Sequence, residues 1–125
     1  MQGVEIFAFL TKGSGQCLLH ERRDPPSFPA FNNLRIDRLC SVVASLHSGL
    51  FGTDAPFTRF KMMGFRVLAL KGRLVDALMV LNDEPTACEH ACLLLGSWLL
   101  TAFEREKEDA IQSAIEEVEK VFHGG

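Results

Sequence analysis

The stretch VDALMVL at 75–81 constrains the fold more than any other part of the chain. Successive side chains of a strand point to opposite faces of a sheet. Here both sets of alternate positions are almost entirely apolar, one set being Val75, Ala77, Met79 and Leu81 and the other Leu74, Leu78 and Val80. A strand that is apolar on both sides belongs in the middle of a sheet with cover on each face. The rest of the chain must therefore supply neighbouring strands and two covering layers.

Four further segments have the composition of strands. The segment 4–11 is rich in β-branched and aromatic residues, the turn KGSG follows, and 16–22 completes a predicted hairpin. The region 57–83 has no helical period. Gly64 and the pair Lys71-Gly72 divide it into three predicted strands, at about 58–63, 65–71 and 73–82. The chain is therefore expected to form five strands.

Two regions carry the three-and-four spacing of a helix with one buried face. In the first region the apolar positions are Ile36, Leu39, Cys40, Val43, Leu46 and Leu50. In the second they are 88, 91, 92, 95, 98, 99, 102 and 103. The charged run EREKED at 104–109 contains no helix breaker, and apolar positions resume after it at Ile111, Ala114, Ile115, Val118, Val121 and Phe122. The sequence leaves open whether 87–122 forms two helices or one bent helix.

Charge and composition argue against several classes of protein. The chain has 125 residues, enough for one domain with a proper core, and a net charge of −3 without the basic stripe of a nucleic-acid binder. Its N-terminus has no basic segment typical of a secretory signal, so the four cysteines are expected to be free thiols. The longest apolar run covers 13 residues, fewer than the ~20 of a membrane span. We expect a soluble protein that is cytoplasmic, or peripheral on endomembranes.

The segment TACEHAC at 86–92 is the cluster that most resembles a chemical site. Thr86 and Glu89 have the spacing of a capping box, which predicts that a helix begins here. Cys88 and Cys92 then fall at i and i+4 on the apolar side of that helix, where cysteine commonly packs in a core. A zinc site needs about four converging ligands, and thiolates near a helix N-terminus gain reactivity. The favoured interpretation is a helix start, and the alternative is a thiol- or metal-dependent enzyme that uses Cys88 and Cys92.

No other catalytic or cofactor motif is present. The four histidines are dispersed, and neither a nucleophile elbow nor a phosphate-binding glycine loop occurs. We therefore predict no catalytic residue, no metal and no cofactor.

The order of the predicted elements resembles the longin domain. VEIFAFLTKGSGQCLLHERRD is similar to the longin opening, IDRLCSVVASLHSGLF to its first helix and FKMMGFRVLALKGRLVDALMVLND to its three-strand meander. The resemblance covers about 3–122 as a single domain. It implies an α+β fold in the order β-β-α-β-β-β-α-α. The five strands would form one antiparallel sheet, with one helix on one face and two on the other.

Longin-like domains mostly serve as interaction platforms and need no catalytic side chain. The resemblance implies a non-enzymatic module of vesicle trafficking or small-GTPase regulation. Such a module would pair with another longin or roadblock-type subunit or with a small GTPase, as a homo- or heterodimer, and would meet membranes only through its partners. The subfamily stays open, although modules of nucleotide-exchange and tethering complexes are the most similar. The expected partner surface consists of the sheet edge and exposed positions of the first helix, namely Phe60, Lys61, Met62, Arg35, Arg38 and Ser45.

Overall fold

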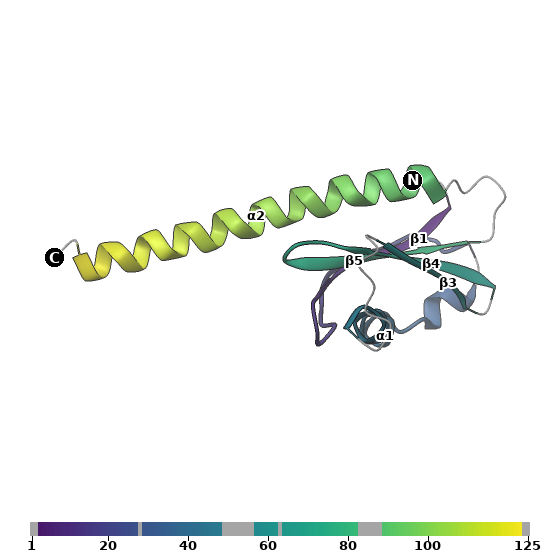
Figure 1. Ribbon diagram of the computed structural model, residues 1–125. Helices are drawn as coiled ribbons and strands as arrows, with labels where there is room; N and C mark the ends of the chain where they lie inside the picture. Colours follow the sequence, from purple (N-terminus) through teal and green to yellow (C-terminus); the bar gives the residue numbers. More distant parts are fainter. Residues whose placement is uncertain (1–2, 28, 49–56, 63, 83–88, 124–125) are drawn as a thin grey trace.

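The computed structural model describes residues 3–27, 29–48, 57–62, 64–82 and 89–123. The chain first forms a hairpin, then a short 3-10 helix and an α-helix, then a three-strand meander, and finally a long helix (Figure 1). The elements are β1 (Val4–Thr11), β2 (Cys17–Arg22), η1 (Pro29–Asn33), α1 (Ile36–Ser48), β3 (Phe57–Met62), β4 (Phe65–Lys71), β5 (Val75–Leu81) and α2 (Glu89–His123).

The strands form one antiparallel sheet in the order β2-β1-β5-β4-β3. The strand that is apolar on both faces, β5, lies at the centre, and all of its residues are buried. The prediction of a central strand with cover on each face is confirmed. The meander order also places β3 at one edge of the sheet and β2 at the other.

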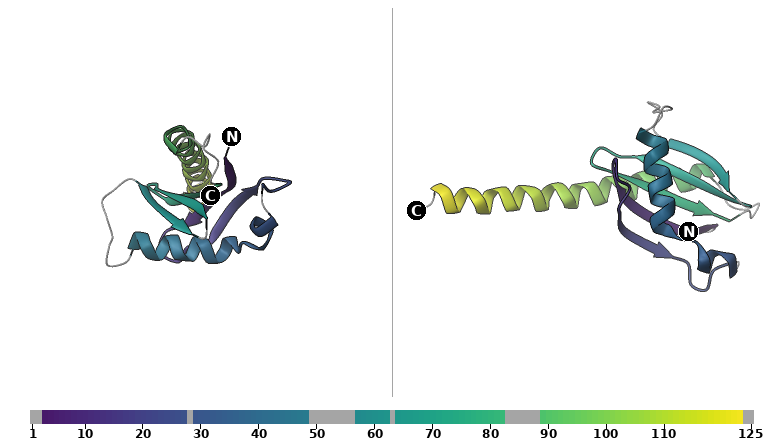
Figure 2. Two further views of the ribbon diagram at one scale, coloured as in Figure 1. Left: turned by 90° about the vertical axis from the view of Figure 1, so that its right-hand side faces the viewer. Right: turned by 90° about the horizontal axis from the view of Figure 1, so that it is seen from below.

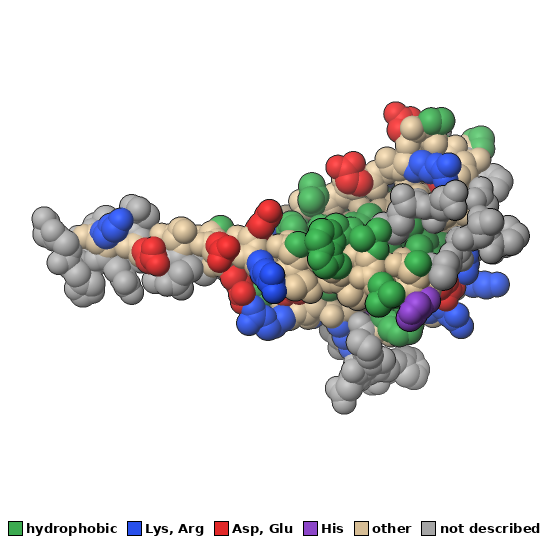
Figure 3. All heavy atoms as spheres, turned by 90° about the horizontal axis from the view of Figure 1, so that it is seen from above, with side chains coloured by type: hydrophobic (Ala, Val, Ile, Leu, Met, Phe, Trp, Pro, Cys, Tyr) green, Lys and Arg blue, Asp and Glu red, His purple; other side chains and the backbone are tan. Residues whose placement is uncertain are grey.

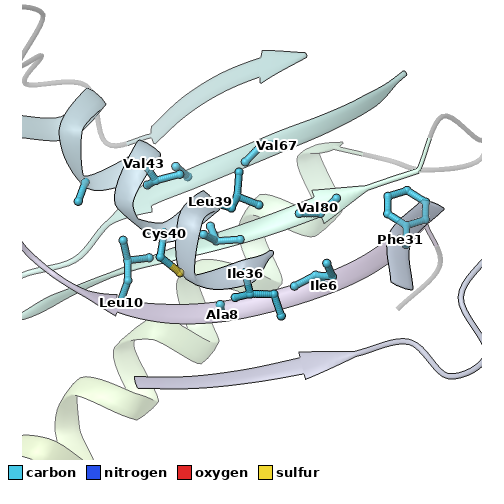
Figure 4. Packing of buried hydrophobic residues seen from close by; sticks show 13 residues of the cluster. Ile6, Ala8, Leu10, Phe31, Ile36, Leu39, Cys40, Val43, Val67 and Val80 are labelled. Atoms are coloured by element: carbon cyan, nitrogen blue, oxygen red, sulfur yellow. The ribbon is translucent and has the colours of Figure 1, made fainter. Parts of the chain in front are cut away.

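The helix α1 covers one face of the sheet (Figures 2 and 4). Its predicted apolar positions Ile36, Leu39, Cys40 and Val43 are all buried against residues of β1, β4 and β5. Leu46 differs from the prediction, because 39% of its surface is exposed. The expected apolar position Leu50 lies outside the described residues.

The first half of α2 covers the other face. Cys92 and Leu100 are buried against β4 and β5, and the rings of Phe9 and Phe103 stack with centroids 4.1 Å apart. The helix lies so close to the sheet that a Cβ atom on Gly96 would come within 2.9 Å of Met79 Cε. A glycine at this position therefore allows the close packing.

The C-terminal region, which the sequence left open as two helices or one, is one helix of 35 residues, so the two helices implied by the longin resemblance are not separate. The junction at 104–109 is rich in glutamate, arginine and lysine, which have high helix propensity, and it contains neither glycine nor proline. The helix therefore continues past the sheet, and its C-terminal part projects away from the rest of the molecule (Figures 1 and 2). In the part of the chain that the structure describes, one α-helix covers each face of the sheet, where the sequence predicted one on one face and two on the other.

The side of α2 that faces the sheet also differs from the predicted stripe. Leu95 and Trp98, which the spacing placed in the core, are 38% and 67% exposed. The inward side is set instead by Gly96 and by the buried carboxylate of Glu104. The backbone N–H groups of Arg73 and Leu74, in the β4–β5 turn, both donate to that carboxylate. The anchor at Glu104 and the close approach at Gly96 together fix the rotation of the helix.

Candidate partner-binding surface

The edge strand β3 contains the first three residues of the expected partner surface. Among the described strands, β3 pairs with β4 alone, which leaves its other side open. Phe60 packs half-buried against the core on the α1 side of the sheet. Lys61 is exposed, and Met62 ends the strand with its side chain outside the described part of the chain. Open strand edges are sites where a further strand can pair.

The α2 side of this edge carries a network of charged side chains. Arg59 Nη1 donates to Glu89 Oε2 at 2.9 Å, and Arg66 Nη1 donates to Glu89 Oε1 at 2.8 Å. Arg66 Nη2 also donates to the carbonyl oxygen of Asn82 at 3.3 Å. One carboxylate at the beginning of α2 thus holds side chains from β3 and β4.

Glu89 joins the beginning of α2 to the sheet, because its carboxylate accepts hydrogen bonds from two arginines. The predicted capping box stays a prediction, since Thr86 lies outside the described residues. The Arg59 hydrogen bond contributes most to lowering the pKa of Glu89; burial acts to raise it, and Arg66 lowers it further. Glu89 is therefore ionised at neutral pH, and the network is a paired set of full charges.

A hollow of about 530 Å³ opens at the network. Its lining residues are Arg59, Phe60, Lys61, Arg66 and Glu89. Three cationic groups face one carboxylate, so the hollow favours acidic or hydrogen-bond-accepting groups. The charged side chains of this lining offer ion pairs and hydrogen bonds to such groups.

The residues expected on α1 lie elsewhere. Arg35 donates to Asp37 at 2.9 Å and lines a hollow beside β2 with Cys17. Arg38 lines a neighbouring hollow against the β1–β2 turn, and Ser45 is exposed on α1. Because β2 and β3 are opposite edges of the sheet, Arg35 and Arg38 do not form one surface with Phe60 and Lys61.

Sequence reasoning missed Arg59, Arg66 and Glu89. Arg59 and Lys61 stand two positions apart in a predicted strand, and that spacing places them on the same face of the sheet. This signal could have identified Arg59. Glu89 lies 30 residues along the chain from Arg59, and no local pattern reveals their pairing.

The cysteines take structural positions wherever the structure describes them. Cys92 is 3% exposed in the core between α2 and the sheet, as the favoured interpretation predicted. Cys88 lies outside the described residues. Among the residues that are described, no three histidine, cysteine, aspartate or glutamate side chains gather as a metal site would require.

The fold and this surface define a small α+β domain with an open, cationic sheet edge. Comparisons with protein-family models and with curated proteins give no match to the chain. Among the described residues, no helix combines the length and the apolar character needed to cross a bilayer.

Proposed function

We propose that this protein is a non-enzymatic interaction module with a longin-like architecture, acting in vesicle trafficking or small-GTPase regulation. The observed element order β-β-α-β-β-β-α and the single five-stranded antiparallel sheet support this architecture. The continuous α2 departs from the expected pattern only after the sheet has been covered.

The open edge at β3 is the observation that carries the proposal. A longin or roadblock-type subunit adds an edge strand of its own to β3, and backbone hydrogen bonds supply the common part of the affinity. Lys61 and the hollow lined by Arg59 and Arg66 then select a partner with acidic groups near its strand. Phe60 supports the edge from the α1 side.

The outer side of α1 forms a second, separate contact in this proposal. Arg35, Arg38 and Ser45 are exposed there, and Arg35 and Arg38 lie beside β2, at the opposite edge of the sheet from β3. A small GTPase or a further subunit can therefore bind this side while β3 is occupied.

Affinity purification of the tagged full chain from its own cells tests the proposal. A stoichiometric longin or roadblock-type subunit, or a small GTPase, is the expected companion. Lys61→Glu should reduce the recovery of the β3 partner at least fivefold, because it reverses the charge of an exposed side chain in the edge strand. Lys107→Glu, the same change on an exposed lysine of α2, is the matched control and should leave the recovery unchanged.

Phe60→Asp is a less clean variant than Lys61→Glu, because Phe60 packs against the α1-side core and its loss also lowers stability. Full recovery of the partner by Lys61→Glu would rule out the β3 edge as the contact. A chain that purifies without any stoichiometric partner would contradict the function itself.

A further inference from the structure

The outer face of α2 carries an apolar surface that neither the sheet nor α1 covers. Its large members are Leu94, Leu95 and Trp98, which are 62%, 38% and 67% exposed. Ala91 and Ala102 extend it by one turn at each end, and we call these five residues the outer stripe. Figure 3 shows hydrophobic side chains gathered on this side of the molecule, over the first half of the helix.

The helix α2 cannot rotate about its axis to turn the outer stripe toward the sheet. The opposite side is held by Gly96, where the backbone approaches Met79, and by Glu104, which accepts from the N–H groups of Arg73 and Leu74. Rotation of α2 would break these contacts. A contiguous apolar surface that stays exposed in this way marks an interaction site.

We propose that the outer stripe joins two copies of this chain through an antiparallel pair of α2 helices centred on Trp98. Every exposed position of α2 between Ala91 and Ala102 is uncharged, so the stripe suits a partner face that is also uncharged. When two copies pair in antiparallel orientation, large side chains of one stripe face small side chains of the other helix. A two-fold axis at Trp98 places Leu94 and Leu95 of one copy opposite the smaller Ala102 and Thr101 of the other.

The charge of the C-terminal half of α2 favours the antiparallel arrangement. The segment 104–123 contains seven acidic and three basic residues. We call its projecting part, 109–123, the arm. In a parallel pair the two acidic arms would lie side by side and repel each other. In the antiparallel pair each arm passes the N-terminal end of the partner's α2, where Arg59 and Lys61 are exposed, and opposite charges attract over about 10 Å at moderate salt.

The size of the outer stripe determines how strongly two copies of the chain are expected to associate. The outer stripe spans eleven helical steps, which is about 17 Å of helix. A stable interface buries about 800 Å² on each partner, and one short helix face provides less than that. The dimer is therefore expected to be reversible, to depend on the arms as well as the stripe, and to weaken as salt increases. The outer stripe lies on a different face from the open edge of β3, so its pairing does not rest on the proposed function, although the arms contact Arg59 and Lys61 in that edge strand.

Trp98 is the only tryptophan in the chain and reports on the contact directly. The full chain is examined over a 1000-fold range of concentration by analytical ultracentrifugation and by tryptophan emission. The expected result is a doubling of mass accompanied by a blue shift of emission over the same range. A monomer whose emission stays constant across the range would overturn the proposal.

Two variants localise the contact. Leu94→Glu should abolish the mass increase, and its circular dichroism should be unchanged because the side chain is 62% exposed. Val42→Glu makes the same kind of change on the outer side of α1, where Val42 is 44% exposed, and should dimerise normally. Dimerisation by Leu94→Glu, or its loss in Val42→Glu alone, would refute the assignment to α2.

Cross-linking tests the direction of the helices. In a background lacking Cys17 and Cys88, a mixture of Leu94→Cys and Ala102→Cys chains should form a disulfide-linked heterodimer on mild oxidation. Leu94→Cys alone should cross-link much less, because the antiparallel register separates its two copies. Preferential cross-linking of Leu94→Cys to itself would show a parallel pair and overturn the proposed geometry.

Discussion

At the scale of single residues, Glu5 shows how a charge is held in the interior. Its carboxylate is 2% exposed and accepts from Asn82 Nδ2 at 3.0 Å and from the backbone N–H of Ser27 at 3.2 Å. Burial acts to raise the pKa of Glu5, but the hydrogen bonds from Ser27 and Asn82, together with the charge of Arg23, lower it below its ordinary value of 4.5. The ionised carboxylate therefore ties the loop after β2 to the end of β5.

The lowered pKa makes the stability of the fold depend on pH. A carboxylate whose pKa is lower in the folded state stabilises the fold above its unfolded pKa, and that contribution is lost as the pH falls through the folded pKa. Glu5→Gln should lower the free energy of unfolding by about 1–3 kcal/mol at pH 7 and by less at pH 3. Urea unfolding at both pH values measures this. Glu21→Gln, at an exposed position of β2, serves as the control, and an equal loss at both pH values would contradict an ionised Glu5.

A second prediction for single residues concerns how readily the cysteines are alkylated. Burial raises the pKa of Cys40 to about 12, with a further contribution from the neighbouring Cys17. Since the thiolate is the species that reacts, Cys40 should resist alkylation at pH 8, and so should the buried Cys92, whereas the half-exposed Cys17 should react. Mass spectrometry of peptides after brief treatment with iodoacetamide checks the pattern. Modification of Cys40 as fast as Cys17 would show that α1 opens readily.

At the scale of elements, the side chain that joins the long helix to the sheet is Glu104. It is 8% exposed, and its carboxylate accepts from the N–H groups of Arg73 and Leu74. Glu104→Ala leaves both donors without their partner and should lower the free energy of unfolding by about 1–3 kcal/mol. Glu106→Ala, at an exposed position in the same turn of α2, should change it by less than about 0.5 kcal/mol. Equal effects of the two changes would mean that Glu104 is no anchor.

The same element shows why sequence reasoning succeeded for the strands and failed for the long helix. Strand bounds were predictable within about two residues, because glycine-containing turns and alternating apolar residues mark them locally. The first half of α2 is apolar on more than one side, with Leu94, Leu95, Trp98 and Leu100 all within two turns. Helical spacing alone does not show which of these sides of the helix faces the sheet. The contacts of Gly96 with Met79 and of Glu104 with the β4–β5 turn decide between them, and those contacts are tertiary.

The candidate partner surface, too, was only partly predictable from the sequence. The position of Phe60 and Lys61 in an edge strand follows from the meander order, which the sequence shows. The separation of β3 from Arg35, which precedes α1, and from Arg38 depends on which edge α1 begins beside, and no local signal carries that information. The pairing of Arg59 and Arg66 with Glu89 likewise depends on where α2 begins above the sheet.

At the scale of the whole molecule, the protein consists of a compact body and an arm of different character. Between Cys92 and Glu108 the long helix is held by the sheet and by the β4–β5 turn, where Arg73 pairs with Glu108. Beyond that point the arm projects from the body, and the exposed side chains described along it include Asp109, Glu116 and Lys120. The body therefore folds around the sheet, while the arm relies on its own helix propensity or on a partner.

Hydrogen exchange separates these two sources of helix stability. A helical segment of 15 residues without tertiary packing is marginally stable in water, so amides in the arm should exchange in the dilute protein roughly 100-fold or more faster than amides at 96–104. At concentrations where two copies pair, contact with the partner's basic edge should slow exchange in the arm, and Leu94→Glu should remove that slowing. The comparison is made by mass spectrometry at low and high protein concentration. Arm amides that stay strongly protected in the dilute Leu94→Glu variant would show that the arm is stabilised within one chain, and the division into body and arm would then be wrong.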